Sequence, residues 1–219
     1  MGQEIDLLEN YPKAKRDINA RKNLKSEEDR KIAREFGKDF FDGDRKHGYG
    51  GFSYFPRFWQ PVVPTFQKQY DLTKDSKVLD VGAAKGFMLY DFTQSIPGIK
   101  VSGIDISSYA VENSIESIKP HLKVGNAIDL PYEDNSFDLV ISINTVHNLE
   151  KEDLAKSLLE IQRVSKKNSF ITVDAYRNEE EKELMYAWNL TAKTVMHVDE
   201  WKKFFGDIGY TGDYYWFMP

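Results

Sequence analysis

The sequence predicts an α/β fold in which helices cover both faces of a doubly wound, mostly parallel sheet. From Lys77 onward, short apolar runs alternate with amphipathic segments, which is the pattern of strands connected by helices. The run Phe137–Ile143 is almost continuously apolar, as expected for a strand that is buried on both faces of a parallel sheet. Glycines and prolines separate the segments and mark their ends.

The expected elements follow one another in regular order. Strands are expected at residues 77–81, 101–106, 122–124, 137–143, 170–173 and 210–217. Helices are expected at residues 86–95, from 107 or 108 to Pro120, around 154–161, and at 179–195 and 199–208. Proline ends two of these helices because it lacks an N–H group. Asp199 is expected to cap the last helix and Gly209 to end it.

Residues 1–70 are expected to form an N-terminal extension, and residues 71–219 the sheet domain. Ile32, Phe36 and Phe40 follow the spacing i, i+4, i+8, which predicts one helix with a buried stripe. Residues 48–59 hold too many glycines for regular structure and too many aromatic residues for a solvated linker. We expect an aromatic lid that excludes water from an active site. The alternative is a hydrophobic latch that holds the N-terminal helix to the domain.

Composition excludes several classes of protein. A net charge of −5 disfavours a general nucleic-acid binder. The absence of cysteine excludes disulfides, zinc sites with cysteine ligands and a cysteine nucleophile. Four scattered histidines give no expectation of a metal site. The sequence has no signal-peptide pattern and no apolar run long enough for a membrane span. We therefore expect a cytoplasmic enzyme with neither nucleic acid nor membrane as partner.

The turn after the first strand carries a pattern for nucleoside binding. In Val78-Leu-Asp-Val-Gly-Ala-Ala-Lys-Gly-Phe87, Gly82 lets a ligand approach the main chain. Gly86 opens a helix whose free N–H groups favour electron-rich ligand atoms. Asp105 ends the second strand, where an acidic side chain binds ribose hydroxyls. A dinucleotide motif would also need glycine at positions 84 and 87, which are Ala and Phe, so a pyrophosphate cofactor is disfavoured.

The spacing Gly82-x-x-x-Gly86 resembles the first motif of class I (Rossmann-like) S-adenosylmethionine-dependent methyltransferases, D-x-G-x-G-x-G, with the small residue Ala84 in place of the middle glycine. Asp105 and residues 125–127, 130–131 and 135–140 resemble further motifs in the same order. Residues 144–149 are similar to the segment that follows strand four in quinone- and sugar-type small-molecule methyltransferases. The resemblance covers about residues 75–175.

The resemblance implies S-adenosyl-L-methionine as cofactor and methyl transfer to an oxygen or nitrogen of a small acceptor, such as a sugar, a nucleotide-sugar or another metabolite. Other functions stay open: a cofactor-binding module without transferase activity, a protein methyltransferase and an NAD-type oxidoreductase. Such methyltransferases commonly close the sheet with a hairpin, whereas one clear strand precedes Pro219 here. Either the sheet is shortened at that edge or another segment covers it.

The resemblance also implies the residues around the cofactor. Ile106 and Ile128 are expected on the two faces of the adenine, and Arg57 is expected to pair with the cofactor carboxylate. The full set of expected cofactor contacts is Asp80, Gly82, Ala83, Ala84, Gly86, Asp105, Ile106, Asn126, Ala127, Ile128, Asn144 and Arg57.

His147 is the expected general base, because it lies a few residues past the central strand and a histidine titrates near neutral pH. The alternative is a histidine that hydrogen-bonds the backbone and shapes the pocket. The expected substrate-binding residues are Tyr49, Tyr54, Asp174, Tyr176 and Arg177. A second aromatic cluster, at residues 186–188 and 214–216, is expected in the core or at a homodimer contact.

Overall fold

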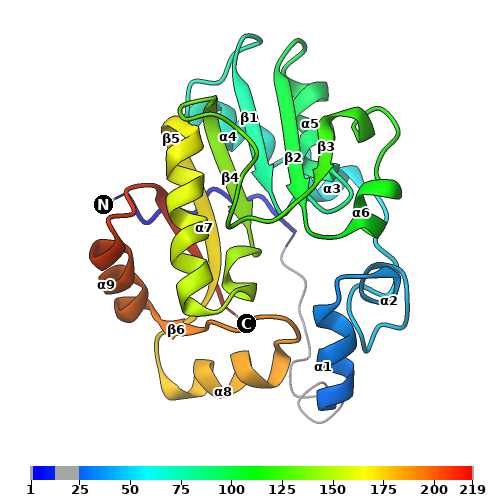
Figure 1. Ribbon diagram of the computed structural model, residues 1–219, viewed down its shortest axis with the longest axis vertical. Helices are drawn as coiled ribbons and strands as arrows, with labels where there is room; N and C mark the ends of the chain where they lie inside the picture. Colours follow the sequence, from blue (N-terminus) through cyan, green and yellow to red (C-terminus); the bar gives the residue numbers. More distant parts are fainter. Residues whose placement is uncertain (1, 13–24, 219) are drawn as a thin grey trace.

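The computed structural model describes residues 2–12 and 25–218. Within these residues seven strands form one sheet in the order β3-β2-β1-β4-β5-β6, and β7 also pairs with β5. All of these strand pairs are parallel. Helices lie on both faces of the sheet (Figure 1). The structure therefore confirms the predicted α/β fold with a doubly wound sheet.

The elements have the following bounds. The strands are β1 (Lys77–Val81), β2 (Lys100–Asp105), β3 (Leu122–Val124), β4 (Phe137–Ile143), β5 (Ser165–Tyr176), β6 (Met196–His197) and β7 (Asp213–Phe217). The α-helices are α1 (Glu27–Arg34), α2 (Lys38–Phe41), α3 (Pro56–Trp59), α4 (Val63–Gln69), α5 (Phe87–Ser95), α6 (Ser108–Glu112), α7 (Lys151–Val164), α8 (Glu179–Trp188) and α9 (Val198–Ile208). Two 3₁₀-helices are η2 (Lys119–His121) and η3 (Val146–Asn148).

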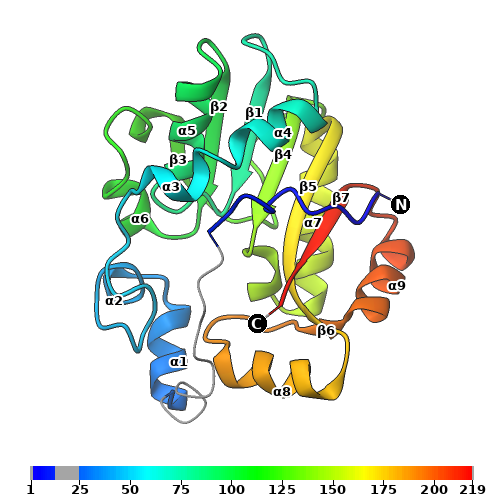
Figure 2. The ribbon, with the colours of Figure 1, turned by 180° about the vertical axis from the view of Figure 1, so that it is seen from behind.

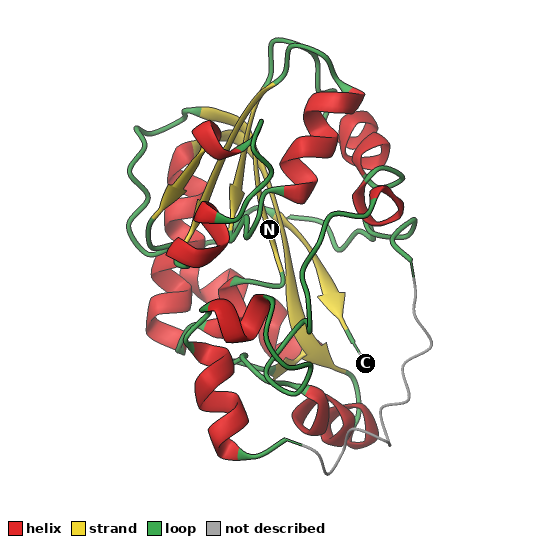
Figure 3. Ribbon diagram, turned by 90° about the vertical axis from the view of Figure 1, so that its right-hand side faces the viewer, coloured by secondary structure: helices red, strands yellow, loops and turns green. Residues whose placement is uncertain are grey.

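Two hydrophobic cores lie on opposite faces of the sheet. One contains residues of α7 and α9, among them Leu158 and Trp201. The other contains residues of α4 and α5, among them Phe66 and Phe92. Figure 2 shows α4 and α5 on the face turned away from the viewer in Figure 1, and Figure 3 shows the helices on either side of the strands. Apolar side chains are therefore buried away from water on both faces of the sheet. This explains why β4 is apolar along almost its whole length.

Four helix predictions are wrong in detail. The helix predicted at residues 179–195 ends at Trp188. The predicted helix up to Pro120 ends at Glu112, and the Ile115 N–H donates instead to the Lys85 carbonyl. The last helix begins after His197, whose ring accepts from the Asp199 N–H, so Asp199 is not its cap. The predicted single helix with a stripe of three apolar residues is broken by Phe36, which adopts a left-handed backbone with φ 50°. Helices α1 and α2 lie on either side of this break.

The N-terminal extension is only partly a separate body. Residues 13–24 lie outside the described residues. Leu7, Val62 and Phe66 are buried in the same core as Leu139 of β4, so residues near both ends of the extension pack on the sheet. The other part, with α1 and α2, lies beyond the carboxyl ends of the strands together with α8 (Figures 1 and 2). The division at residue 70 stays a prediction.

The first residues of the chain extend the sheet beyond β7. Glu4 forms a parallel bridge with Tyr214. The Ile5 N–H donates to the Tyr214 carbonyl, and the Tyr214 N–H donates to the Gln3 carbonyl, both at 3.0 Å. Tyr214 is buried at 3% exposure, as is Trp216 at 4%, so this part of the second aromatic cluster belongs to the core. Of the two alternatives for the sheet edge, the second is therefore correct, because another segment covers it.

Candidate active site

The candidate site lies at the carboxyl ends of the strands. β1 pairs with β2 on one side and β4 on the other, so the chain crosses in opposite directions from this central point. Ligands of doubly wound folds bind at such a switch point. The last residues of the strands and the segments that follow them contain all the predicted site residues except Tyr49, Tyr54 and Arg57.

The turn after β1 is shaped by two glycines. Gly82 has φ 89°, and a Cβ atom built on it would lie 2.1 Å from Thr145 Oγ1. Its N–H donates to the Ile104 carbonyl at 2.7 Å. Gly86 has φ 75° and caps the start of α5. Both positions require a residue without a side chain, because L-residues are strained at these angles.

Ala84 also has a left-handed backbone, with φ 48°. This is the position at which the resembling motif has its middle glycine. An alanine Cβ is small enough to fit, but the conformation itself costs about 1 kcal/mol for an L-residue. The strain of this turn therefore comes from backbone angle rather than from side-chain size.

Asp105 holds the turn through both carboxylate oxygens. Oδ2 accepts from the Ala84 N–H at 2.7 Å, and Oδ1 accepts from the Ser107 N–H at 2.8 Å. Burial raises the pKa of Asp105 more than these two hydrogen bonds lower it. Each carboxylate oxygen accepts at least two hydrogen bonds. Asp105 therefore has room for the two ribose hydroxyls while it keeps both backbone contacts.

Asp80 is the second carboxylate of the site, and it is 6% exposed. Burial, together with the Asp105 carboxylate nearby, raises the pKa of Asp80 to about 7. Neither carboxylate forms an ion pair with another residue in the part of the chain that the structure describes. Two buried acids without a cation are costly, so this region fits a positively charged ligand.

The residues expected around the adenine lie after β2 and β3. Ile106 is 55% exposed although it is apolar. Asn126, Ala127 and Ile128 are partly buried, and the Asn126 side chain accepts from the Ile128 N–H at 3.2 Å. This turn fixes the loop that follows β3. The space expected for the adenine therefore has the exposed Ile106 side chain on one side and the ordered loop after β3 on the other.

Asn144 follows β4 and is tied to β5. It has φ 52°. Its side-chain oxygen accepts from Thr172 Oγ1 at 2.8 Å, and its N–H donates to the same hydroxyl at 2.9 Å. The two bonds hold the start of the 144–148 segment in position.

His147, Asp174 and Asn189 form a buried polar cluster at the ends of β4 and β5. The His147 Nδ1 atom accepts from the Asp174 N–H at 2.9 Å, and the Asn189 side-chain amide donates to the Asp174 carboxylate. Burial lowers the pKa of His147 to about 3. A neutral ring that accepts at Nδ1 carries its proton on Nε2. Asn189, at the end of α8, has no signal in the sequence that would have placed it here.

The strand predicted at residues 170–173 extends to Tyr176, so Asp174 and Tyr176 lie within β5 and Arg177 follows it. Tyr176 is partly buried. The Tyr176 ring packs edge-on against His197 at 5.7 Å, and Lys182 Nζ lies 5.5 Å from its centroid. Arg177 is exposed, its N–H donates to Glu181, and its carbonyl contacts the His197 ring at 2.9 Å. Asp174 is thus inside the polar cluster, whereas Tyr176 and Arg177 lie outside it.

The chain from Phe36 to Trp59, which we call the aromatic segment, is fastened to the turn after β1 by an ionic cluster that the sequence did not indicate. The Asp42 carboxylate accepts from Lys85 Nζ at 2.6 Å, from Tyr109 Oη at 2.7 Å and from the Phe52 N–H at 2.8 Å. Lys85 also donates to the Phe52 carbonyl at 2.9 Å. Burial raises the pKa of Asp42, but these partners outweigh it and bring the pKa to about 2. We call these four residues the Asp42 cluster. A lysine between two glycines of a buried turn was the available signal, since buried lysines need a partner.

The predicted lid residues lie at three different places. Tyr49 is 44% exposed and packs against Phe52, with ring centroids 4.3 Å apart. The Tyr54 hydroxyl donates to Asp91 of α5 at 2.6 Å. The exposed Arg57 guanidinium lies 4.9 Å from the Phe58 ring. The structure therefore places Tyr54 beside the helix α5, whereas Tyr49 lies near the Asp42 cluster.

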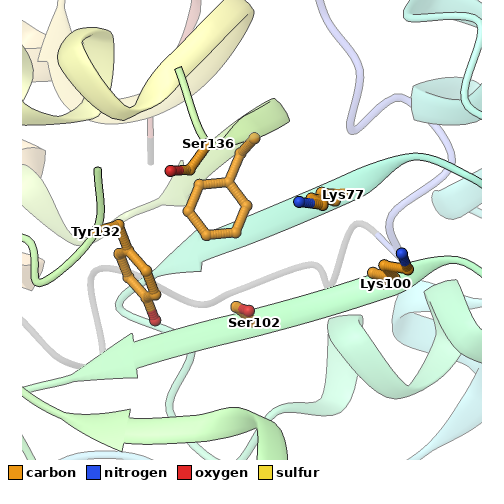
Figure 4. A pocket seen from close by; sticks show the side chains of 6 residues that line it. Lys77, Lys100, Ser102, Tyr132 and Ser136 are labelled. Carbon is orange, nitrogen blue, oxygen red and sulfur yellow. The ribbon is translucent and has the colours of Figure 1, made fainter. Parts of the chain in front are cut away.

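A separate cavity of about 320 Å³ lies at the opposite ends of the strands. It is lined by Lys77, Lys100 and Phe137, which begin β1, β2 and β4, and by residues that include Tyr132 (Figure 4). It is not part of the site described above.

Within residues 2–12 and 25–218, no group of three or more acidic, histidine or cysteine side chains is arranged to hold a metal ion. The same residues contain no helix that is long and apolar enough to span a membrane.

The glycine turn, the acid at the end of β2 and the parallel sheet define a Rossmann-like nucleoside-binding protein. A family model described as "Methyltransferase domain" matches residues 72–214, and the chain belongs to this family. This confirms the predicted resemblance to class I S-adenosylmethionine-dependent methyltransferases. S-Adenosylmethionine is the methyl donor of that class.

Individual relatives are similar over part of their lengths. The chain is 32% identical over 126 residues to a demethylmenaquinone methyltransferase of Symbiobacterium thermophilum, covering 53% of this chain and 49% of the relative. It is 31% identical over 99 residues to the arginine-hydroxylase NDUFAF5, mitochondrial, of Mus musculus, covering 44% and 28%. The crystal structure of YcgJ from Bacillus subtilis has a TM-score of 0.54 at 20% identity, covering 67% of this chain and 66% of that chain, and shows the fold alone.

Proposed function

We propose that this protein transfers a methyl group from S-adenosylmethionine to an oxygen or nitrogen of a small-molecule acceptor. The observation that carries the proposal is the pair of buried carboxylates, Asp80 and Asp105, beside a turn that Gly82 and Gly86 keep free of side chains. S-Adenosylmethionine carries a sulfonium and an ammonium group, which supply the positive charge that the two acids lack.

The residues present fit this cofactor part by part. Asp105 has lone pairs for the ribose, and the exposed Ile106 gives an apolar surface for the adenine. Asp80 supplies a negative charge for the amino-acid part. An NAD-type cofactor is less suited, because Ala84 and Phe87 replace the glycines that let a pyrophosphate approach the main chain.

The protein's part in the reaction is mainly alignment. When bound, the sulfonium supplies an activated methyl group, so a well-placed acceptor needs little further help. The neutral His147 ring, held at Nδ1 by the Asp174 N–H, has Nε2–H as its donor. Its role as general base stays a prediction, and the ring would have to release the Asp174 contact to accept a proton at Nδ1.

The aromatic segment is proposed as a lid over the cofactor. Residues 36–52 contact the starts of α5 and α6, through the Asp42 cluster and through Ser107, whose hydroxyl donates to the Phe36 carbonyl. When this segment lies over the turn after β1, it excludes water, which strengthens the electrostatic contacts of the turn. The latch alternative assigns these same contacts to stability only.

A small acceptor agrees with the net charge of −5, which disfavours nucleic acid. The chain spans from 28% to 59% of the lengths of the first four curated relatives, so its acceptor, a homodimer and a cytoplasmic location are proposals. A protein acceptor and a binding module without activity are the alternatives. They are separated by whether labelled methyl from S-adenosylmethionine enters metabolites, protein or neither.

Isothermal titration provides the first test. We expect S-adenosylhomocysteine to bind and NAD not to bind. Asp105→Ala should weaken S-adenosylhomocysteine binding by about a hundredfold or more, because two hydrogen bonds to a charged group contribute about 3 kcal/mol or more. The exposed Asp75→Ala is the control and should bind normally. Binding of NAD alone would contradict the proposal, and an unaltered affinity in Asp105→Ala would contradict the ribose assignment.

A further inference from the structure

A cavity of about 490 Å³ lies between α1, α8 and the start of α7. Arg30 and Arg34 line it from one face of α1, because residues four apart share a helix face. Tyr186 and Asn189 line it from α8, and Lys193 from the segment that follows. Figures 1 and 2 show α1 and α8 at the same end of the molecule, beyond the carboxyl ends of the strands.

The cavity shares a wall with the polar cluster of the active site. Asn189 contributes to the lining and donates to the Asp174 carboxylate. Lys193 also lines it, and its N–H donates to the His147 carbonyl at 3.0 Å. A molecule in the cavity therefore lies against the same backbone that positions His147.

Positive charge in the cavity exceeds negative charge. Arg30 pairs with Glu27 at 2.9 Å, and Lys193 lies 3.7 Å from Glu150. Both acids also line the cavity. The guanidinium of the exposed Arg34 forms no ion pair or hydrogen bond with any residue in the described part of the chain. One cation is thus left over after the pairs are matched.

The remaining lining suits a polar organic molecule rather than a bare ion. The Tyr186 ring is 52% exposed and gives a flat apolar surface, and the Arg30 guanidinium is fixed by Glu27 and by the Tyr186 carbonyl at 3.3 Å. A guanidinium binds phosphate or carboxylate through two parallel hydrogen bonds. A cavity lined by both Arg34 and this ring therefore fits a ligand with one oxyanion group and an organic body.

We propose that this cavity binds the methyl acceptor, that the acceptor carries a phosphate or carboxylate, and that Arg34 is the residue that recognises this group. The proposal deepens the proposed function, since it names the class of acceptor. It rests on the proposed function in one respect, namely that the ligand of this cavity is the methyl acceptor. The oxyanion lies toward α1, while the rest of the molecule extends toward Asn189 and Lys193, which contact Asp174 and His147.

The test uses the whole chain with two probes, inorganic pyrophosphate and D-glucuronate, titrated calorimetrically with and without saturating S-adenosylhomocysteine. We expect at least one probe to bind, and Arg34→Ala to weaken that binding tenfold or more. Arg34→Lys should restore part of it, because the charge is kept and the paired geometry is lost. Lys31→Ala is the control, since Lys31 is an exposed cation on the same helix that does not line the cavity.

Each outcome has a clear meaning. Binding of pyrophosphate but not glucuronate identifies a phosphorylated acceptor, and the reverse identifies a carboxylate. Failure of both probes to bind overturns the proposal, as does binding that Arg34→Ala leaves unchanged or that Lys31→Ala weakens equally. If S-adenosylhomocysteine does not bind but Arg34-dependent anion binding remains, the proposed methyltransferase function fails while the anion site stands.

Discussion

Replacing Asp42 by asparagine should release the aromatic segment without unfolding the sheet. The substitution keeps an oxygen that can accept from the Phe52 N–H or the Tyr109 hydroxyl, but it removes the charge that Lys85 pairs with at 2.6 Å. Lys85 is 7% exposed. The variant therefore leaves a nearly buried ammonium with only the Phe52 carbonyl, unless the segment moves away and lets water reach it.

The size of the effect follows from the pKa of Asp42. The native contacts bring this pKa from 3.8 to about 2, and at 1.36 kcal/mol per unit the charged form gains about 2.4 kcal/mol. The side chain is 25% exposed, so screening reduces this to about 2 kcal/mol. That free energy corresponds to an opening equilibrium about 30-fold more favourable.

Hydrogen–deuterium exchange measures this opening directly. Amides of residues 36–52 should exchange about 30-fold faster in Asp42→Asn, while amides of β1 and β4 stay protected. The matched control is Asp44→Asn, an exposed position two residues away where asparagine can still accept from the Lys46 N–H. Unchanged protection in Asp42→Asn, or an equal loss in Asp44→Asn, would refute the role of the ion pair. The stabilisation is complete above pH 3.8 and is lost as the pH falls toward 2.

Three further predictions concern the cofactor turn and the polar cluster. The pKa of Asp80 is about 7 without a cation beside it, so S-adenosylmethionine should bind roughly tenfold tighter at pH 8 than at pH 6. Calorimetry should find no such pH dependence for the Asp80→Asn variant, nor for binding of methylthioadenosine, which lacks the ammonium group. Ala84→Gly should raise the free energy of unfolding by up to about 1 kcal/mol, because it relieves a left-handed alanine; a clear loss in urea unfolding would show that the turn is not strained. Burial lowers the pKa of His147 to about 3. The stabilisation from the neutral, buried His147 ring is therefore complete above pH 6.5 and is lost as the pH falls toward 3. Over this range the free energy of unfolding should fall by about 1.4 kcal/mol per pH unit. Urea unfolding of His147→Gln should lose this slope and that of the exposed His121→Gln should keep it; equal slopes in the two variants would place the His147 ring in water.

The sequence predicted the bounds of β1, β3 and β4 without error, because the apolar residues of each strand form one short run with the pattern of a strand. The positions of Gly82 and Asp105 followed from the same reasoning, since parallel strands bring their carboxyl ends to one edge of a sheet. Asp80 was expected at the site only from the family resemblance. Local pattern therefore determines both the central strands and the residues that directly follow them.

Long-range contacts were not predictable in this way. The stripe from Ile32 to Phe40 fits a continuous helix, and nothing local marks the left-handed Phe36 that breaks it. Asp42 and Lys85 are 43 residues apart in sequence, and no local pattern selects one acid among the many of the extension as the partner. Asn189 was missed for the same reason, because its contact with Asp174 depends on how α8 docks.

The pairing of residues 3–5 with β7 sets an order for the assembly of the sheet. Residues 3–5 cannot find their place until the strand at 213–217 has been made, since Glu4 bridges Tyr214. Contacts of such large sequence separation form late and slow folding. Until residues 3–5 pair with it, β7 presents unpaired backbone groups, the kind of edge at which chains associate wrongly. A bulky fusion placed directly before Gln3 would prolong this exposure, so a tag at that position is best avoided in production of the protein.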